Sequence, residues 1–112
     1  MIDQVRPSDL AAWFAQNADA TPVLLDVREP WELQTASVAP QGFTLLAIPM
    51  NEVPARLAEL DEGQRIACLC HHGARSQRVA AFLSQSGLAE VANVAGGIDA
   101  WSAQHDAAVP RY

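Results

Sequence analysis

The amino-acid sequence predicts an α/β fold, a three-layer sandwich in which a central, mostly parallel five-stranded sheet carries helices on both faces. Short apolar runs alternate along the chain with segments of helical periodicity, and this order implies right-handed β-α-β crossovers. Residues 22–27 form a nearly continuous apolar run, which is typical of a parallel strand covered on both faces. With 112 residues and 50% hydrophobic content, the chain fits a single domain over residues 1–112.

The first part of the chain predicts a strand, a helix and a second strand. Residues 2–6 fit a short edge strand, and Pro7 suits the first turn of the helix that follows. The apolar face of this helix repeats at positions i, i+3 and i+4, as Leu10, Trp13 and Phe14. After the buried strand at 22–27, residues 28–33 predict a short helical turn and residues 35–43 an irregular connection.

The middle of the chain predicts a third strand and a second full helix. Residues 44–48 fit the strand, which Pro49 closes. Asn51 is a candidate N-cap for an α-helix that ends at residues 61–63. The shared apolar face of this helix is formed by Val53, Leu57 and Leu60.

The last part of the chain predicts a central strand at residues 66–69, a helix that stops at Gly87, and a final strand at residues 91–94. Gly96 and Gly97 then turn the chain into a last helix, on which Trp101 is expected to pack into the core. Residues 105–112 predict a loose tail.

The charge of the chain argues against two classes of partner. Seven arginines, with no lysine, stand against thirteen acidic residues and give a net charge of -6. A chain this acidic, without a basic run, predicts neither nucleic acid nor an anionic membrane as a partner. A small anionic ligand remains compatible with this charge, because backbone amides and one arginine act at short range.

The thiols and the N-terminal segment predict a cytoplasmic protein. The chain starts without the pattern of a secretory signal, and no apolar run approaches the ~18 residues of a transmembrane helix. Cys68 and Cys70 are too close in sequence for an unstrained disulfide. Thiols that stay reduced fit the cytoplasm.

Cys70 is the candidate nucleophile. It follows a buried strand and precedes a helix, so its thiol is expected at the carboxyl end of the strand, facing the first turn of the helix. The helix dipole and the unpaired amides there favour a thiolate. Gly73 lets the backbone curl so that these amides converge on the sulfur. The alternative is a buried structural cysteine.

Three segments, taken together and in this order, resemble the rhodanese family. They are Asp26-Val-Arg-Glu29, Cys70-His-His-Gly-Ala-Arg-Ser76 and Val94-Ala-Gly-Gly-Ile-Asp-Ala-Trp101. The resemblance spans residues 3–104 and is that of a single-domain member. The cysteine loop and the Gly-Gly-Ile-x-x-Trp ending are specific only in combination.

The resemblance implies a sulfurtransferase that needs no metal or organic cofactor. Its loop cysteine, here Cys70, takes a sulfane sulfur from a donor such as thiosulfate, becomes a persulfide, and passes the sulfur to a thiol or to cyanide. A protein is a further candidate for the sulfur acceptor. A second hypothesis is a non-enzymatic persulfide carrier, or a module that only binds a partner protein.

The residues after Cys70 predict a loop that binds substrate and persulfide, made of His71, His72, Gly73, Ala74, Arg75 and Ser76. Arg75 would bind the anionic donor and lower the pKa of the thiol, or lie exposed in the first helical turn. Ser76 would donate to the persulfide or cap the helix. His71 and His72 would add positive charge at the pocket mouth or tune specificity as exposed residues.

Loop length argues against a cysteine-dependent phosphatase or arsenate reductase. Those enzymes place five residues between their cysteine and arginine, whereas four residues separate Cys70 from Arg75. The tighter ring suits one sulfur atom better than a phosphoryl group with three equatorial oxygens.

Two charged residues at the end of the second strand are predicted to be structural, and a group of adjacent cysteines and histidines is not predicted to bind a metal ion. Asp26 and Arg28 are predicted to support the rim of the site, Asp26 by accepting loop amides and Arg28 by pairing with Glu32; direct catalysis is the alternative. No metal site is predicted, because the adjacent ligands Cys68, Cys70, His71 and His72 cannot readily close a tetrahedron within one extended stretch.

Overall fold

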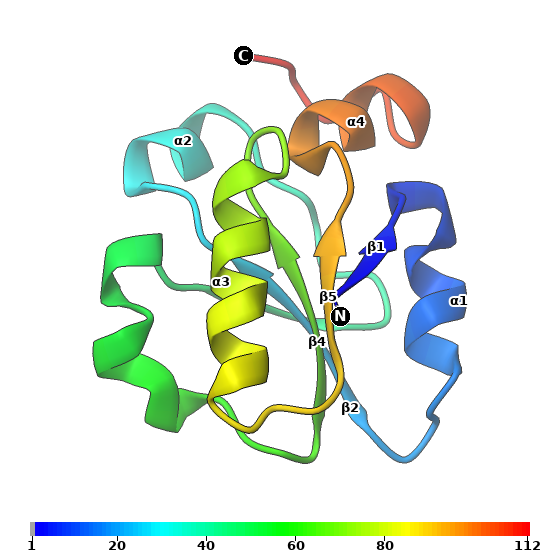
Figure 1. Ribbon diagram of the computed structural model, residues 1–112. Coiled ribbons are helices and arrows are strands. Elements are labelled where there is room, and N and C mark those ends of the chain that lie inside the picture. Colours follow the sequence, from blue (N-terminus) through cyan, green and yellow to red (C-terminus); the bar gives the residue numbers. More distant parts are fainter. Residues whose placement is uncertain (1) are drawn as a thin grey trace.

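The computed structural model describes residues 2–112 and contains one five-stranded sheet (Figure 1). The strands are β1 (Asp3–Val5), β2 (Thr21–Asp26), β3 (Thr44–Ala47), β4 (Gln64–Leu69) and β5 (Val91–Val94). Their order across the sheet is β1-β5-β4-β2-β3, and every pair of neighbours is parallel. The predicted α/β class and five-stranded sheet are therefore confirmed.

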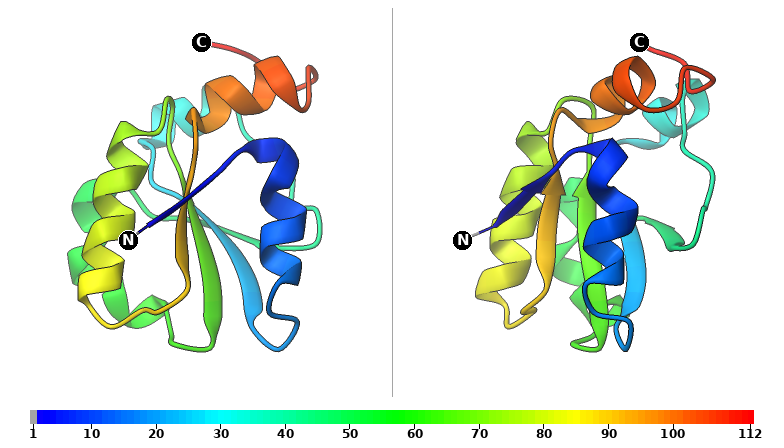
Figure 2. Two further views of the ribbon diagram at one scale, coloured as in Figure 1. Left: turned by 45° about the vertical axis from the view of Figure 1, so that its right-hand side comes forward. Right: turned by 90° about the vertical axis from the view of Figure 1, so that its right-hand side faces the viewer.

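Helices cover both faces of the sheet, as Figure 2 shows. One face carries α1 (Leu10–Ala15) and α4 (Gly97–Gln104), and the other carries α3 (Ala74–Gln85). Alternate residues of the strands enter the two layers: Leu24 packs with α1 and α4, while Val23 and Leu25 pack on the side of α3. Burial on both faces explains the continuous apolar sequence of the central strands.

The segment after Asn51 differs from the predicted α-helix. It forms two 3₁₀ helices, η2 (Met50–Glu52) and η3 (Pro54–Glu59), and Asn51 caps neither of them. Pro54 lacks the amide that an α-helix would need in its interior, and the backbone leaves helical geometry at Arg56, where φ is -111°. The predicted α-helix is therefore wrong, although Val53 is buried in the core as its pattern indicated.

Residues 105–112 also differ from the predicted loose tail. Val109 is buried in the same cluster as Trp101, and the Ser102 hydroxyl donates to its carbonyl oxygen. Arg111 pairs with Asp99 of α4, with Nε and Oδ1 3.1 Å apart. A single valine in a polar segment has no periodicity to indicate burial, so only the tertiary structure reveals this contact. Trp101 itself is buried, as predicted.

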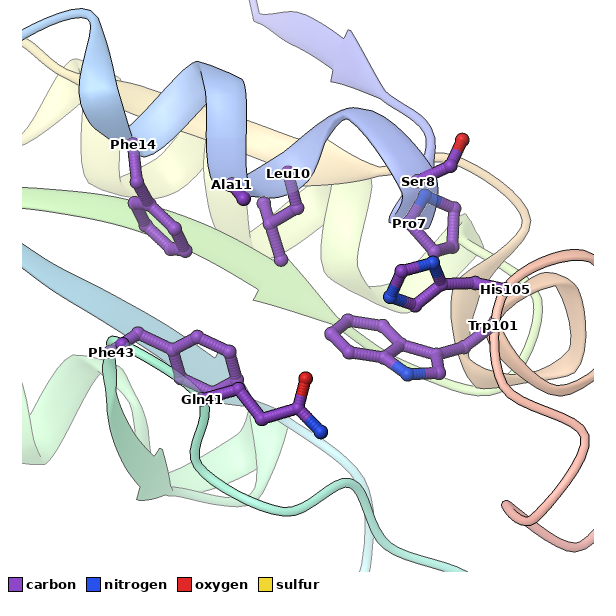
Figure 3. Close-up of a pocket in the computed structure, with 10 residues that line it drawn as sticks. Pro7, Ser8, Leu10, Ala11, Phe14, Gln41, Phe43, Trp101 and His105 are labelled. Atoms are coloured by element: carbon purple, nitrogen blue, oxygen red, sulfur yellow. The ribbon is translucent and has the colours of Figure 1, made fainter.

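A cavity of about 170 Å³ lies on the face of α1 and α4, between Phe14, Phe43 and Trp101 (Figure 3). None of its lining residues belongs to the Cys70 loop. Within residues 2–112, no helix is both long enough and apolar enough to cross a membrane.

Candidate active site

The loop after β4 meets the start of α4 at the carboxyl edge of the sheet. Backbone hydrogen bonds join the two segments: Ile98 donates to the Cys70 carbonyl at 2.8 Å and Asp99 to the His71 carbonyl at 3.1 Å. Gly97 permits this approach, because a Cβ at that position would lie 2.4 Å from the His71 oxygen. The loop is thus held between two elements that the parallel sheet brings together.

Two donors converge on the Cys70 sulfur. The Gly73 amide lies 3.0 Å from Sγ and the Ser76 hydroxyl 3.2 Å from it. Gly73 has a φ of +108°, a backbone conformation that residues with a side chain rarely adopt. The loop therefore curls as the sequence indicated, and its amide and hydroxyl lie within hydrogen-bond distance of the sulfur.

Cys68 has a different environment from Cys70. Both thiols are free and both are buried in the same core cluster beside α3, but Cys68 lies within β4 whereas Cys70 follows the end of that strand. Burial raises the pKa of Cys68, and the neighbouring Cys70 adds to this rise. Cys68 is therefore suited to packing, whereas Cys70 faces hydrogen-bond donors at the end of the strand.

Asn93 is part of the site and was not identified from the sequence. This buried β5 residue donates from Nδ2 to the Gly73 carbonyl at 3.2 Å and to Gln4 at 3.0 Å. Its Oδ1 therefore faces the Ser76 hydroxyl, which donates to it at 2.5 Å. Because the Ser76 hydroxyl has one proton, it donates at any moment either to Asn93 or to the Cys70 sulfur. The available signal was an amide side chain within the apolar run 91–94.

Replacing Asn93 by alanine is expected to lower the free energy of unfolding by about 1–3 kcal/mol, because it leaves buried partners in the loop unpaired. Urea denaturation measures this loss. Asn17→Ala is the matched control, since its amide bonds Glu90 at a partly exposed position away from the loop. Equal losses in the two variants would contradict an anchoring role for Asn93.

Arg75 is engaged by a carboxylate that the sequence did not assign to it. Its two terminal nitrogens donate to Glu32 of α2 (Pro30–Thr35) at 2.6 and 2.8 Å. Hydrogen bonds from Arg75, and then from Tyr112 and the Glu29 amide, lower the pKa of Glu32 to about 2. The pKa of Arg75 is raised, chiefly by Glu32. The guanidinium is therefore already paired before any anion binds.

Arg28 pairs with Asp26, so the predicted ion pair with the Glu32 side chain is wrong. Its Nη2 lies 2.7 Å from Asp26 Oδ2, and both side chains are buried. Asp26 also accepts the Arg28 amide at 3.2 Å, while Arg28 reaches only the Glu32 carbonyl. Burial opposes the charge, yet hydrogen bonds to Asp26 and Tyr112 raise the pKa of Arg28. Glu32 turns instead towards Arg75 across the edge of the sheet.

Tyr112 connects these groups to the histidines of the loop. Its hydroxyl donates to Glu32 at 2.6 Å and accepts from Arg28 at 3.0 Å. Its ring stacks on His71, with centroids 3.9 Å apart, and His72 stacks on the other side of His71 at the same distance. Trp31 is 62% exposed, and its ring packs against Tyr112 in an edge-on arrangement. Because Tyr112 lies in the predicted loose tail, no sequence pattern indicated its role.

The fold and the loop together define a class of protein: a parallel α/β domain that presents a cysteine in a cradle of donors at the carboxyl edge of its sheet. The model of the rhodanese-like domain family matches residues 10–104. The chain belongs to this family.

Similar proteins agree with this assignment along nearly the whole chain. A sulfurtransferase of Allochromatium vinosum is 30% identical over 102 residues, which cover 91% of this chain and 90% of that protein. The thiosulfate sulfurtransferase GlpE of Coxiella burnetii is 29% identical, with coverages of 88% and 87%. The crystal structure of a rhodanese-related protein from Thermoplasma volcanium superimposes with a TM-score of 0.76 at 32% identity, covering 92% and 93% of the two chains. Sulfur transfer is therefore the general chemistry that the relatives support.

Proposed function

We propose that this protein is an enzyme that transfers a sulfane sulfur from thiosulfate or a related donor to a thiol or to cyanide through a persulfide on Cys70. The observation that carries the proposal is the convergence of the Gly73 amide and the Ser76 hydroxyl on the Cys70 sulfur. The similarity to the two sulfurtransferases supports it.

The proposed reaction has two steps. In the first, the Cys70 thiolate attacks the outer sulfur of thiosulfate; a new S–S bond forms, the old one breaks, and its electron pair leaves with sulfite. In the second, a thiolate or cyanide attacks the terminal sulfur of the persulfide, and the electron pair of that S–S bond returns to Cys70. No external oxidant or reductant is needed.

The surrounding groups would have distinct roles in this reaction. Gly73 and Ser76 would stabilise the sulfur anion that is present before and after each transfer. Arg75, paired with Glu32, would hold the first turn of α3 in place and contribute less to donor binding than its sequence position indicated. His71 and His72 would line the rim that the donor crosses.

Intact mass measured after incubation with thiosulfate tests the proposal. The wild-type chain is expected to gain the mass of one sulfur atom, and Cys70→Ser is expected to gain none. Cys68→Ser is the matched control, because it removes the other free thiol of the chain, two residues before Cys70, and it should still be labelled. A label that persists in Cys70→Ser would overturn the proposal.

Discharge of the label separates the enzyme from the alternatives. Repeated turnover with cyanide or a low-molecular-weight thiol is expected of an enzyme, whereas a label that only a protein partner removes would indicate a carrier. Hydrolysis of p-nitrophenyl phosphate that depends on Cys70 would instead indicate a phosphatase.

The two free thiols are consistent with a reducing compartment such as the cytoplasm.

A further inference from the structure

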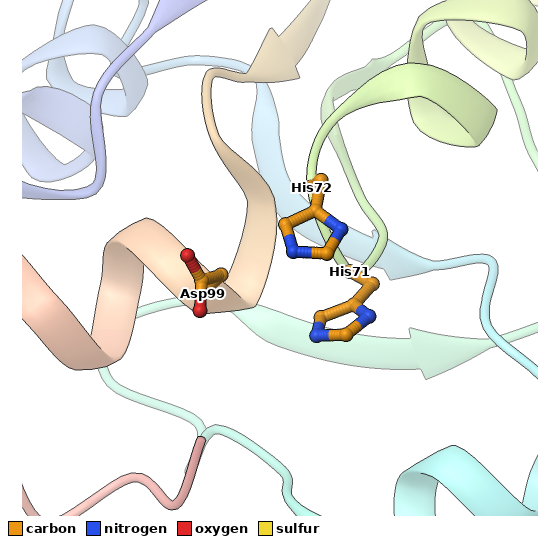
Figure 4. Close-up of side chains that lie close together, drawn as sticks. All are labelled: His71, His72 and Asp99. Carbon is orange, nitrogen blue, oxygen red and sulfur yellow. The ribbon is translucent and has the colours of Figure 1, made fainter. Parts of the chain in front are cut away.

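Three side chains with metal-ligating atoms gather beside the Cys70 loop. They are His71 and His72 of the loop and Asp99 of α4, and their ligand atoms all lie within 4.8 Å of one another. Figure 4 shows that both imidazoles direct the ring nitrogen remote from the backbone towards the Asp99 side. The three groups come from two segments, the Cys70 loop and the first turn of α4.

One of these nitrogens lacks a partner. The Nε2 atom of His71 is buried and makes no hydrogen bond to any group in residues 2–112. A buried polar atom left unpaired costs stability, so such an atom is uncommon without a ligand or an ordered water. A neutral imidazole presents at this nitrogen the lone pair that binds a transition metal.

The backbone holds the three side chains close before any ligand arrives. The Asp99 amide donates to the His71 carbonyl at 3.1 Å, which ties the first turn of α4 to the loop. The His71 ring is held between Tyr112 and His72, each 3.9 Å away. This packing reduces the conformational entropy that a ligand must otherwise remove at His71.

We propose that His71, His72 and Asp99 form a binding site for a divalent transition metal such as Zn²⁺. Two imidazole nitrogens and one carboxylate oxygen are ligands that Zn²⁺ accepts, and water completes the tetrahedron. Bonds of about 2.0–2.2 Å require side-chain rotations that bring the three ligand atoms closer together and turn the His72 ring out of its stack on His71, because the lone pairs of two nearly parallel rings do not meet at one ion. Such rotations are available to His72, which is exposed, and to Asp99, which is partly exposed.

Arg111 competes for the same carboxylate. Its Nε and Nη2 lie 3.1 and 3.3 Å from the two Asp99 oxygens. The Arg111 side chain is exposed, so it can leave Asp99 and return to water when a metal ion binds. Arginine and metal are therefore alternative partners of Asp99.

The sequence alone did not predict this site for a structural reason. Ligands adjacent in one stretch cannot surround an ion, and the third group, Asp99, comes from the helix that follows β5. Only the packing of α4 against the loop adds the missing carboxylate.

Competition with a chromogenic zinc indicator tests the site. The measurement uses the full chain carrying Cys70→Ser, so that the thiolate does not bind the ion. This protein is expected to bind one Zn²⁺. Adding Asp99→Asn should weaken binding at least about tenfold, because a charged ligand becomes a weak neutral one. Adding Arg111→Ala should strengthen binding severalfold, because the competing cation is removed.

The third histidine of the chain provides the matched control. His105 lies at the end of α4, outside the cluster, and His105→Ala should leave zinc affinity unchanged. Circular dichroism confirms that each variant is folded. Equal zinc affinity with and without Asp99→Asn, or an equal loss in His105→Ala, would overturn the site.

A second measurement concerns the effect on Cys70 and rests on the proposed sulfur transfer. The metal would bind the two residues that follow Cys70, so zinc is expected to slow persulfide formation in the wild-type chain. Asp99→Asn should require at least about tenfold more zinc for the same inhibition, matching its lost affinity. If zinc binds but no persulfide forms even without zinc, the proposed function is wrong and the metal site still stands. If zinc inhibits both proteins equally, the inhibition comes from direct binding of zinc to Cys70.

Discussion

Replacing Gly97 by alanine is expected to lower the free energy of unfolding by about 2–5 kcal/mol. The φ of +61° costs a residue with a side chain about 1–2 kcal/mol. The new Cβ would also lie 2.4 Å from the His71 carbonyl oxygen and 2.5 Å from that of Cys70. Relief of this clash must move the backbone, and overpacking of this kind costs about 1–3 kcal/mol more.

Urea denaturation of Gly97→Ala measures the loss, and Gly42→Ala is the matched control. Gly42 has a similar φ of +76°, but a Cβ there would meet no atom within 4 Å. The control should show only the cost of the backbone conformation, about 1–2 kcal/mol. Equal losses in the two variants would mean that the close contact between the loop and α4 contributes nothing to stability. Because the clash displaces Cys70 itself, Gly97→Ala is also expected to lose sulfur labelling at thiosulfate concentrations that label the control.

Replacing Glu32 by glutamine is expected to destabilise the domain by about 3 kcal/mol, the lower end for breaking a buried ion pair. Glu32 is 2% exposed and accepts hydrogen bonds from both Arg75 and Tyr112. Arg75 retains access to water, with 31% of its side chain exposed, and this limits the loss. Urea denaturation at neutral pH measures it.

The same substitution is expected to change how stability depends on pH. The pKa of Glu32 is lowered from 4.5 to about 2 in the folded chain, principally by Arg75. Its contribution, on the order of 3 kcal/mol, is therefore complete above pH 4.5 and is lost as the pH falls towards 2. Glu32→Gln should lose less stability than wild type over this interval.

Glu59→Gln serves as the control for the acid limb. Glu59 also pairs with an arginine, Arg56, but both groups lie at the surface, where water screens the pair. Glu59→Gln should therefore lose stability between pH 5 and 2 as steeply as the wild type does. If Glu32→Gln and the wild type lose stability in parallel between pH 5 and 2, the ion pair with Arg75 is not responsible for that limb.

The strands and the cysteine loop could be predicted from the sequence because their signals are local. A continuous apolar run predicts a doubly covered strand, and Cys70 stands directly between such a run and a helical pattern. The prediction of an α-helix after Asn51 was wrong because it relied on the spacing of the apolar residues and not on Pro54, which lacks the amide that an α-helix interior needs. Local rules therefore succeed where one signal dominates and fail where two compete.

The partners of the site residues could not be predicted in this way. The spacing of four residues predicted an ion pair between Arg28 and Glu32. In the structure Glu32 instead pairs with Arg75, 43 residues further along the chain. Asn93 reaches Ser76 across 17 residues, and Tyr112 arrives from a segment with too little apolar character to show that it packs. Each pairing depends on distances between loops, which a helix or strand period does not encode.

The class of fold, the family and the position of Cys70 could be read from the amino-acid sequence, since these follow from periodicity and from residues contiguous in the chain. The pairing of the charges, the anchoring of the loop by Asn93 and the place of Asp99 beside the histidines emerge only from the packing of distant segments. The physical reason is that the parallel register of β2, β4 and β5 brings their carboxyl ends to one edge, and it does so whatever their separation in sequence.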